Sequence, residues 1–387
     1  MTLSSHLAPH QRVFASFAIY AFGLGQIYPR LPAVKDQMGI EEGALGLALM
    51  GLALGTLIAL TFGASVVERL GHRRTVLWLT PAQSVLFAIA IFAPGPVALF
   101  LLLIPAGLTI GALEIVINVE ADRTEAELGR RIMNRAHAFW SIGFFGAGIF
   151  GALMAQIGIS PQLHMILVVP LVTGAIWLLL SDFQPASKRG TDTNGDAPTF
   201  ARPSRAILVL VGISISAMLL EGASIDWSAI YMVSVFATAP FMGGLAIAAA
   251  ALSQAVVRYF ADRFVDRFNP VRVARTMQAM MALGVVAVFI AWHPVVGLIG
   301  FGLIGAGTSV MFPLTMSAAA QRSDRPAAVN VAALAQFSFV AFLLGPPLLG
   351  FVAEHFGLRW TFGVGLPLVL ISMALSGALE PKKVESP

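Results

Sequence analysis

The sequence contains no cysteine among its 387 residues, and it has few charged side chains. The absence of cysteine excludes disulfide bonds and thiolate chemistry, so the redox compartment is not constrained. Asp, Glu, Lys and Arg make up 11% of the chain, whereas 57% of the residues are hydrophobic. Because a soluble domain carries about 25% charged residues, water is not the main solvent of this protein.

Motifs for catalysis and cofactor binding are also missing. The sequence has no P-loop, no glycine-rich dinucleotide motif, no cluster of metal ligands and no Ser-His-Asp elbow. We therefore expect no enzyme, no cofactor and no metal site. The net charge of +4 does not predict nucleic-acid binding, because the basic residues lie in loops between apolar runs. The first apolar run is too long for a cleavable signal peptide and is expected to remain as a span.

The sequence does contain twelve apolar runs. Each has ~17 to 25 residues with few charges, which is the length of a helix that crosses a bilayer. The predicted spans are residues 13–32, 43–67, 75–92, 97–119, 136–157, 165–180, 206–225, 242–260, 274–292, 295–318, 329–352 and 362–379. We therefore predict an all-α integral membrane protein with twelve transmembrane helices.

The loops between these runs predict an orientation. If both termini are cytoplasmic, 21 of the 24 basic residues lie on the inner side, and only Arg30, Lys35 and Arg359 lie outside. Positively charged loops stay in the cytoplasm during insertion. The charge distribution thus predicts a multi-pass protein with both termini in the cytoplasm.

The chain also repeats part of itself. The charged loop Glu68–Arg74 has a weaker echo at residues 266–272, and the segment 151–158 is echoed at 350–357. A repeat of this length indicates two related halves. We predict a first six-helix half at residues 1–181, a cytoplasmic linker at 182–205 and a second six-helix half at 206–387.

These features together resemble the major facilitator superfamily. The family's loop after the second helix reads Gly-x-x-x-Asp-Arg-x-Gly-Arg-Arg. Here Arg69, Gly71 and Arg73 follow it, whereas Ala64, Glu68 and His72 depart from it, and Glu68 keeps the negative charge. The resemblance implies a pseudo-symmetric transporter in which contacts of this loop hold the cytoplasmic face closed in one state. It covers nearly the whole chain.

Shorter motifs resemble a poorly characterised bacterial subgroup of that superfamily. They are Arg30–Pro32, Asn118 to Glu120, Asn134 with His137 to Gly143, Glu221–Gly222 and Asp226–Trp227. This resemblance implies a transporter of the bacterial inner membrane and does not supply a substrate. We expect the protein to be a monomer surrounded by lipid, with a small molecule as its substrate. Features of the drug–proton antiporter branch are missing, because the fourth span has no Arg upstream of Gly107 and the fifth lacks a Gly-Pro pair.

Charged residues near the cytoplasmic ends of the spans are predicted to form a gate between the halves. For Arg258 and Asp262, which are four residues apart in the stripe that begins at Gln254, an internal ion pair is the alternative. The predicted gate residues are Glu68, Arg69, Gly71, Arg73, Asp122, Arg123, Arg258, Asp262, Asp266 and Arg267.

Polar residues inside the predicted spans are the candidates for substrate or proton contact, because an ionisable group in the bilayer is costly unless it has a wet cavity or a partner. Gln26 and Arg30 share one face with Phe22, Glu114 shares a face with Asn118, and His137 shares a face with Asn134 and Ser141. The candidates are Gln26, Arg30, Glu114, Asn118, His137 and Glu221.

Three of these candidates also have a structural alternative. Arg30 would be a snorkelling anchor at the membrane surface instead of a cationic contact for an anionic or polyhydroxylated solute. Glu114 would pair with Arg123 or Arg135 instead of carrying a proton. His137 would be an interfacial histidine held by hydrogen bonds instead of a proton relay.

The sequence thus predicts a secondary active transporter for a small polar organic solute, such as a sugar or sugar acid, coupled to protons. Two alternatives are efflux of amphipathic drugs, suggested by 27 Phe and 15 Met residues, and a membrane receptor or scaffold without transport.

Overall fold

Helices make up nearly all of the regular structure in the computed structural model, which describes residues 7–187 and 201–380. Within these ranges the chain forms no β-strand. This agrees with the hydrophobic composition, because a helix satisfies its backbone hydrogen bonds internally when no water is available. The all-α membrane fold that the sequence predicts is confirmed.

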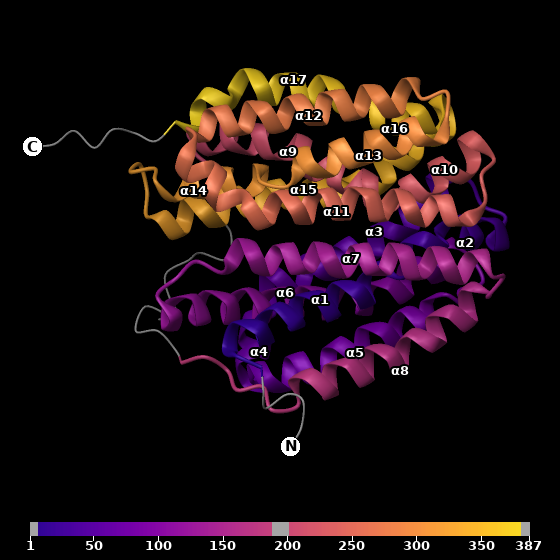
Figure 1. Cartoon of the computed structure of the whole chain (residues 1–387), viewed down its shortest axis with the longest axis horizontal. Coiled ribbons are helices and arrows are strands. Elements are labelled where there is room, and N and C mark those ends of the chain that lie inside the picture. Colours follow the sequence, from indigo (N-terminus) through magenta and orange to yellow (C-terminus); the bar gives the residue numbers. More distant parts are fainter. Residues whose placement is uncertain (1–6, 188–200, 381–387) are drawn as a thin grey trace, which may run out of the picture.

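The chain forms two groups of helices, which lie one above the other in Figure 1. The first group consists of α1 (Pro9–Gly25), η2 (Tyr28–Arg30), α2 (Leu31–Met38), α3 (Glu42–Phe62), α4 (Ala64–Leu70), α5 (His72–Ala90), α6 (Pro96–Leu128), α7 (Met133–Gln156) and α8 (Pro161–Leu180). The second consists of α9 (Arg205–Asp226), α10 (Ser228–Phe236), α11 (Pro240–Arg267), α12 (Pro270–Ile290), α13 (Pro294–Thr308), α14 (Met311–Ala320), α15 (Ala327–Phe356), α16 (Leu358–Gly363), α17 (Gly365–Leu375) and η3 (Ser376–Leu379). We call these groups the first and the second half.

Ten helical segments of the described chain are long and apolar enough to cross a membrane. Ten of the twelve predicted spans coincide with them. The other two predicted spans are occupied by α1, which has 17 residues before the chain breaks into η2 and α2, and by α5, which has 19 residues. Twelve crossings therefore stay a prediction, whereas the multi-pass membrane architecture is established.

Proline and glycine mark many of the helix ends. Pro96 and Pro240 begin α6 and α11, where a missing N–H costs nothing because the first turn has no partner for it. Gly39 and Gly129 end α2 and α6 with left-handed φ angles of 61° and 62°. Glycine takes this conformation without the clash that a Cβ atom would cause. These residues account for where α6 and α11 begin and where α2 and α6 end.

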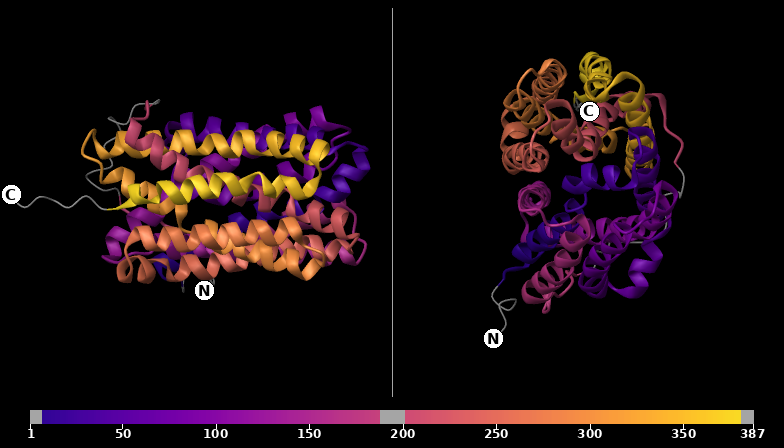
Figure 2. Two further views of the ribbon diagram at one scale, coloured as in Figure 1. Left: turned by 90° about the horizontal axis from the view of Figure 1, so that it is seen from above. Right: turned by 90° about the vertical axis from the view of Figure 1, so that its right-hand side faces the viewer.

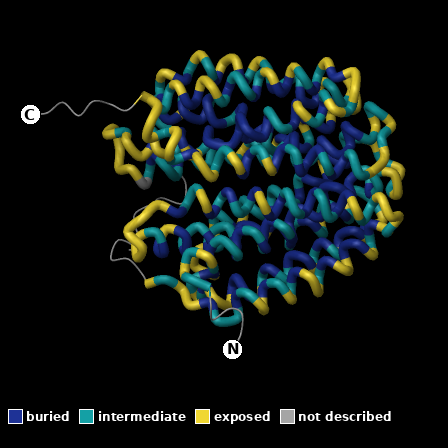
Figure 3. Tube along the Cα trace, viewed as in Figure 1, coloured by how far each residue is buried: buried dark blue, intermediate teal, exposed yellow. Residues whose placement is uncertain are grey.

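The two ends of the bundle differ in charge. We call the end that carries α4, α14 and the connections 129–132 and 321–326 the basic end, because Arg130, Arg131, Arg322 and Arg325 lie in these connections. It lies on the left in Figure 1, and the opposite end, with α2, α10 and α16, lies on the right. Figure 3 shows exposed positions gathered at the ends and outer helices, with buried positions inside.

The halves pack most closely near the opposite end. There α7 lies beside α11, and α3 lies beside α15. Both contacts depend on glycine: a Cβ atom on Gly244 would lie 2.6 Å from Ala152 Cβ, and one on Gly46 would lie 2.3 Å from the backbone oxygen of Pro346. Small residues let helix backbones approach in this way. The right-hand view of Figure 2 shows the two halves end-on, one above the other and in contact.

Candidate functional site

A cavity of about 750 Å³ lies between the two halves. Its size is within the usual range for small-molecule sites. The lining comes from helices of both halves and reaches toward the basic end at Leu60, Met133 and Met316. The titratable and amide side chains in this lining are Tyr20, Tyr28, Glu114, Asn118, Asn134, His137, Glu221, Asp226 and Arg258.

The first half contributes a chain of hydrogen bonds around Glu114. The hydroxyl group of Tyr20 donates to Glu114 Oε1 at 2.9 Å, and Asn118 Nδ2 donates to Oε2 at 3.1 Å. His137 Nε2 lies 3.1 Å from Asn118 Oδ1. Glu114 and Asn118 are one turn apart on α6, so the helix presents both to the cavity. Neutral donors thus compensate the carboxylate for its removal from water.

The second half contributes Arg258 of α11, which makes contacts in three directions. Its Nη2 atom lies 3.3 Å from Glu221 Oε1, its Nη1 donates to Ser141 Oγ at 3.0 Å, and its Nε donates to the backbone oxygen of Ser309 at 3.1 Å. Ser141 belongs to the first half. Arg258 therefore joins the halves across the cavity wall.

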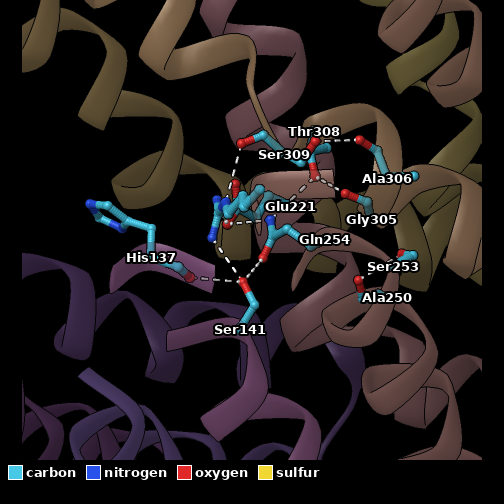
Figure 4. Close-up of polar contacts among 11 residues, drawn as sticks. His137, Ser141, Glu221, Ala250, Ser253, Gln254, Gly305, Ala306, Thr308 and Ser309 are labelled. Atoms are coloured by element: carbon cyan, nitrogen blue, oxygen red, sulfur yellow. Dashed lines mark hydrogen bonds and ion pairs between the residues drawn. The ribbon is translucent and has the colours of Figure 1, made fainter. Parts of the chain in front are cut away.

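Gln254 completes this network one turn along α11. Its Nε2 donates to Glu221 Oε1 at 2.9 Å, and its Oε1 accepts from Ser141 Oγ at 3.0 Å. Figure 4 shows Gln254 between Ser141 and Glu221, with Thr308 on the other side. We call Ser141, Glu221, Gln254 and Arg258 the bridging network.

The bridging network depends on a break in the predicted tenth span. α13 ends at Thr308 and α14 begins at Met311. Ser309 lies in this break, and its carbonyl oxygen accepts from Arg258. Irregular backbone at membrane depth needs such a donor, because lipid offers none. Pro313, four residues after Ser309, has no N–H to donate to this carbonyl oxygen. The sequence therefore carries a signal for the break, but the predicted span 295–318 runs straight through it.

Gln26 and Arg30 do not line the cavity. Gln26 is buried and its Oε1 lies 2.9 Å from His164 Nε2, while Arg30 is 3% exposed and Nη2 donates to the backbone oxygen of Ile159. The four-residue spacing placed them on one face, but the cavity face of this segment carries Tyr20, Leu24 and Tyr28. The same spacing among these three was the signal that could have found them.

Two of the residues predicted for the gate, Glu68 and Arg123, form a largely buried cluster with His72 and Glu120 within the first half. Glu68 lies 3.5 Å from His72 Nε2 and 3.8 Å from Arg123 Nη2, and Glu120 contacts His72 Nδ1. Glu120 Oε2 also accepts from the backbone N–H of Ala186, beyond α8. Arg123 therefore belongs to this cluster, and Glu114 has its partners elsewhere.

Two contacts at the basic end do connect the halves. Asn134 Nδ2 donates to Asp262 Oδ1 at 2.6 Å, and Arg131 lies 3.4 Å from Asp266 between exposed side chains. Arg258 lies away from these contacts, in the cavity, and its ion pair is with Glu221 instead of with Asp262. This corrects both its predicted place in the gate and the alternative of an internal pair on α11.

The other predicted gate residues lie at the basic end in varied surroundings. Arg73 donates to the backbone oxygen of Ser181 at 2.5 Å, and Arg267 lies over the ring of Phe268 at 5.5 Å. Gly71 turns the chain between α4 and α5 with a φ of 82°. Arg69 lies in the last turn of α4, and Asp122 is exposed on α6.

Two helical halves around a cavity that is mainly apolar and carries a few charged and amide side chains are the arrangement of many membrane transporters. The chain belongs to the Major Facilitator Superfamily, whose family model matches residues 13–222 and 209–387. This confirms the family that the charged loop and the repeat predicted.

The relatives include bacterial proteins over nearly the full length. An uncharacterised MFS-type transporter of Yersinia pestis is 26% identical over 372 residues, covering 95% of this chain and 94% of the relative. An uncharacterised transporter of Sinorhizobium fredii is 28% identical over 370 residues, covering 95% and 97%. Among solved structures, an aspartate-to-alanine variant of the nucleoside transporter NupG matches with a TM-score of 0.74 at 12% identity, covering 96% of this chain and 100% of that one. This likeness shows the fold alone.

Proposed function

We propose that the protein is a secondary active transporter that moves a small polar organic solute across the bacterial inner membrane by alternating access. The observation that carries this proposal is the cavity of about 750 Å³, lined by polar side chains of both halves. A site built from two halves changes its access when the halves rock against each other. The substrate classes we propose are sugars, related hydroxylated solutes and, because a structural neighbour transports nucleosides, nucleosides.

The structure is consistent with the state of this cycle in which the cavity is open toward the basic end and closed at the opposite end. The halves are in close contact near the opposite end, where the backbone N–H of Gly43 also donates to Glu354 at 3.0 Å. The cavity lining extends toward the basic end. If the basic end faces the cytoplasm, as the distribution of arginine predicts, both termini are cytoplasmic and the solute exchanges with the cytoplasm in this state.

We further propose that Glu114 binds the coupling proton. Within the described residues its hydrogen-bond partners are neutral and no cation lies within ion-pair distance. A carboxylate at membrane depth needs a counter-charge when the cavity closes. A proton supplies that charge in one state and leaves in the other.

Replacing Glu114 by Gln is expected to uncouple the protein from the proton gradient. Accumulation of solute driven by a pH gradient in proteoliposomes should fall about tenfold or more, which corresponds to ~1.4 kcal/mol of lost coupling. Exchange of solute at equal pH should continue, because Gln still accepts from Tyr20. The matched control is Glu41→Gln, an exposed glutamate at the start of α3. Undiminished gradient-driven accumulation by Glu114→Gln would exclude the proton role.

A second candidate function is efflux of amphipathic drugs. The observation that favours it is the aromatic part of the cavity lining, which includes Trp140, Phe144, Phe339 and Phe342. Aromatic walls accept varied apolar solutes. Transport of a lipophilic dye in the same proteoliposomes, with no response to any polar solute, would favour this function. Saturable binding without flux would instead favour a receptor.

A further inference from the structure

The cavity has more negative than positive side chains. Three carboxylates line it, those of Glu114, Glu221 and Asp226, whereas Arg258 is its one guanidinium among the described residues. Arg258 is already paired with Glu221. An anionic solute would therefore enter beside carboxylates with no free cation to meet it, and like charges at short distance repel strongly where water is excluded.

Asp226 is the carboxylate without a partner. It lies at the end of α9, and within the described residues its side chain makes no hydrogen bond and no ion pair. Glu221 uses Oε1 for both Gln254 and Arg258, while Oε2 has no contact of this kind in the same residues. Both side chains thus offer oxygen atoms that can still accept hydrogen bonds.

The donors that line the cavity are mostly occupied. Each side-chain nitrogen of Arg258 has a partner, and the hydroxyl group of Tyr20 donates to Glu114. Asn118 also donates to Glu114, so its Oδ1 accepts from His137 Nε2–H. In the neutral imidazole this leaves His137 Nδ1 as an acceptor. Trp140 Nε1 and the Tyr28 hydroxyl group remain as donors without a partner in the described residues. Among the charged and amide side chains and His137, however, the free capacity is for accepting hydrogen bonds.

We infer that the transported solute is a hydroxylated primary amine that binds as a cation, with its ammonium group at Asp226 and Glu221. This inference rests on the proposed transport function and narrows its substrate class: it excludes sugar acids. An ammonium group supplies three donors and one positive charge, which match the free acceptors and the excess negative charge. The ring of Tyr28, also in the lining, adds a surface that attracts cations.

The test is a thermal-shift titration of the purified full chain with matched triplets. One triplet is glucosamine, glucose and glucuronate, and a second is ethanolamine, ethylene glycol and glycolate, at a pH where the amines are protonated. We expect the amine of at least one triplet to raise the Tm and to bind about tenfold or more tightly than its neutral member, with no shift from the acid. A larger shift from a neutral or acidic member, or no shift from either amine, overturns the inference.

A charge variant locates the amine. Asp226→Asn should weaken binding of the amine about tenfold or more, the range for a hydrogen bond to a charged group, and leave any binding of the neutral member unchanged. Asp36→Asn, at an exposed residue of α2, is the matched control. Equal losses of amine and neutral binding in Asp226→Asn overturn the assignment. If this variant cannot be purified, the relative affinities of the amine, the neutral member and the acid for the unchanged protein still test the inference.

Two further outcomes separate this inference from the proposed function. Uptake of neutral solutes or nucleosides, with inert amines, leaves the transport function standing and overturns the amine. Tetraphenylphosphonium, a cation without N–H or O–H donors, tests charge alone; stronger binding of this cation than of every amine overturns the donor requirement and favours the efflux of amphipathic compounds.

Discussion

Replacing Arg258 by Gln is expected to abolish transport, because this side chain is bound to both halves at once. Its contacts are Glu221 and the Ser309 carbonyl oxygen in the second half and Ser141 in the first. Movement of the halves must remake these contacts, so their loss changes the relative free energies of the two states. We expect the initial rate of solute uptake in proteoliposomes to fall on the order of 100-fold, equivalent to ~2.8 kcal/mol.

The same variant is expected to lower stability. Breaking a buried ion pair costs ~3–5 kcal/mol. Here the side chains of Arg258 and Glu221 are 12% and 18% exposed to the cavity, and solvent screening reduces the cost to about 1–2 kcal/mol. A lower Tm in detergent checks this. The double variant Arg258→Gln with Glu221→Gln should recover most of the lost Tm, since no unpaired charge remains, but it should not recover transport.

Two further variants test the geometry of the bridging network. Arg258→Lys keeps the charge but lacks the planar guanidinium group that contacts three partners. We therefore expect this variant to keep most of the original Tm but to lose most of the transport rate. Arg263→Gln removes an exposed arginine of the same helix and serves as the control. If Arg258→Gln transports at the rate of Arg263→Gln, the bridging network has no part in the movement.

Much of the fold could be predicted because a bilayer leaves few choices. Apolar length predicts helices, and charged loops predict their ends. Part of the site near Glu114 could also be predicted from helix geometry. Glu114 and Asn118 are one turn apart on α6, and His137 is a polar residue of the neighbouring helix α7. Helix periodicity places Glu114 and Asn118 on one face, whereas their contacts with Tyr20 of α1 and His137 of α7 also need the packing of three helices.

The bridging network needs geometry that periodicity does not supply. Arg258 and Asp262 have the spacing of an internal ion pair, yet the guanidinium group donates to the carbonyl oxygen of Ser309. Pro313 leaves this oxygen without a helical partner, but periodicity does not show that Arg258 lies close enough to reach it. Gln26 and Arg30 show a second limit. Their spacing predicts that they share a face. Only the packing of Gln26 against α8 and of Arg30 against Ile159 shows that this face is turned away from the cavity.

Replacing Gly46 by Val is expected to prevent closure at the opposite end. A Cβ atom at this position would lie 2.3 Å from the backbone oxygen of Pro346 and 3.2 Å from Pro347 Cα. Two successive prolines hold this backbone stiffly, so the halves must separate there. Overpacking costs ~1–3 kcal/mol, enough to shift the equilibrium between the two states on the order of 10- to 100-fold toward opening at this end.

The absence of cysteine makes this shift measurable, because spin labels attach only where cysteines are introduced. Labels at Gln37 and His355, exposed in the two halves at the opposite end, should move apart in Gly46→Val. Labels at Arg130 and Arg267, at the basic end, should approach each other, and solute uptake should be lost. Gly174→Val is the control, since a Cβ atom there meets no other atom within 4 Å. Unchanged distances at both ends would mean that this glycine contact does not control which end is open; opposite changes would tie a single backbone contact between α3 and α15 to alternating access.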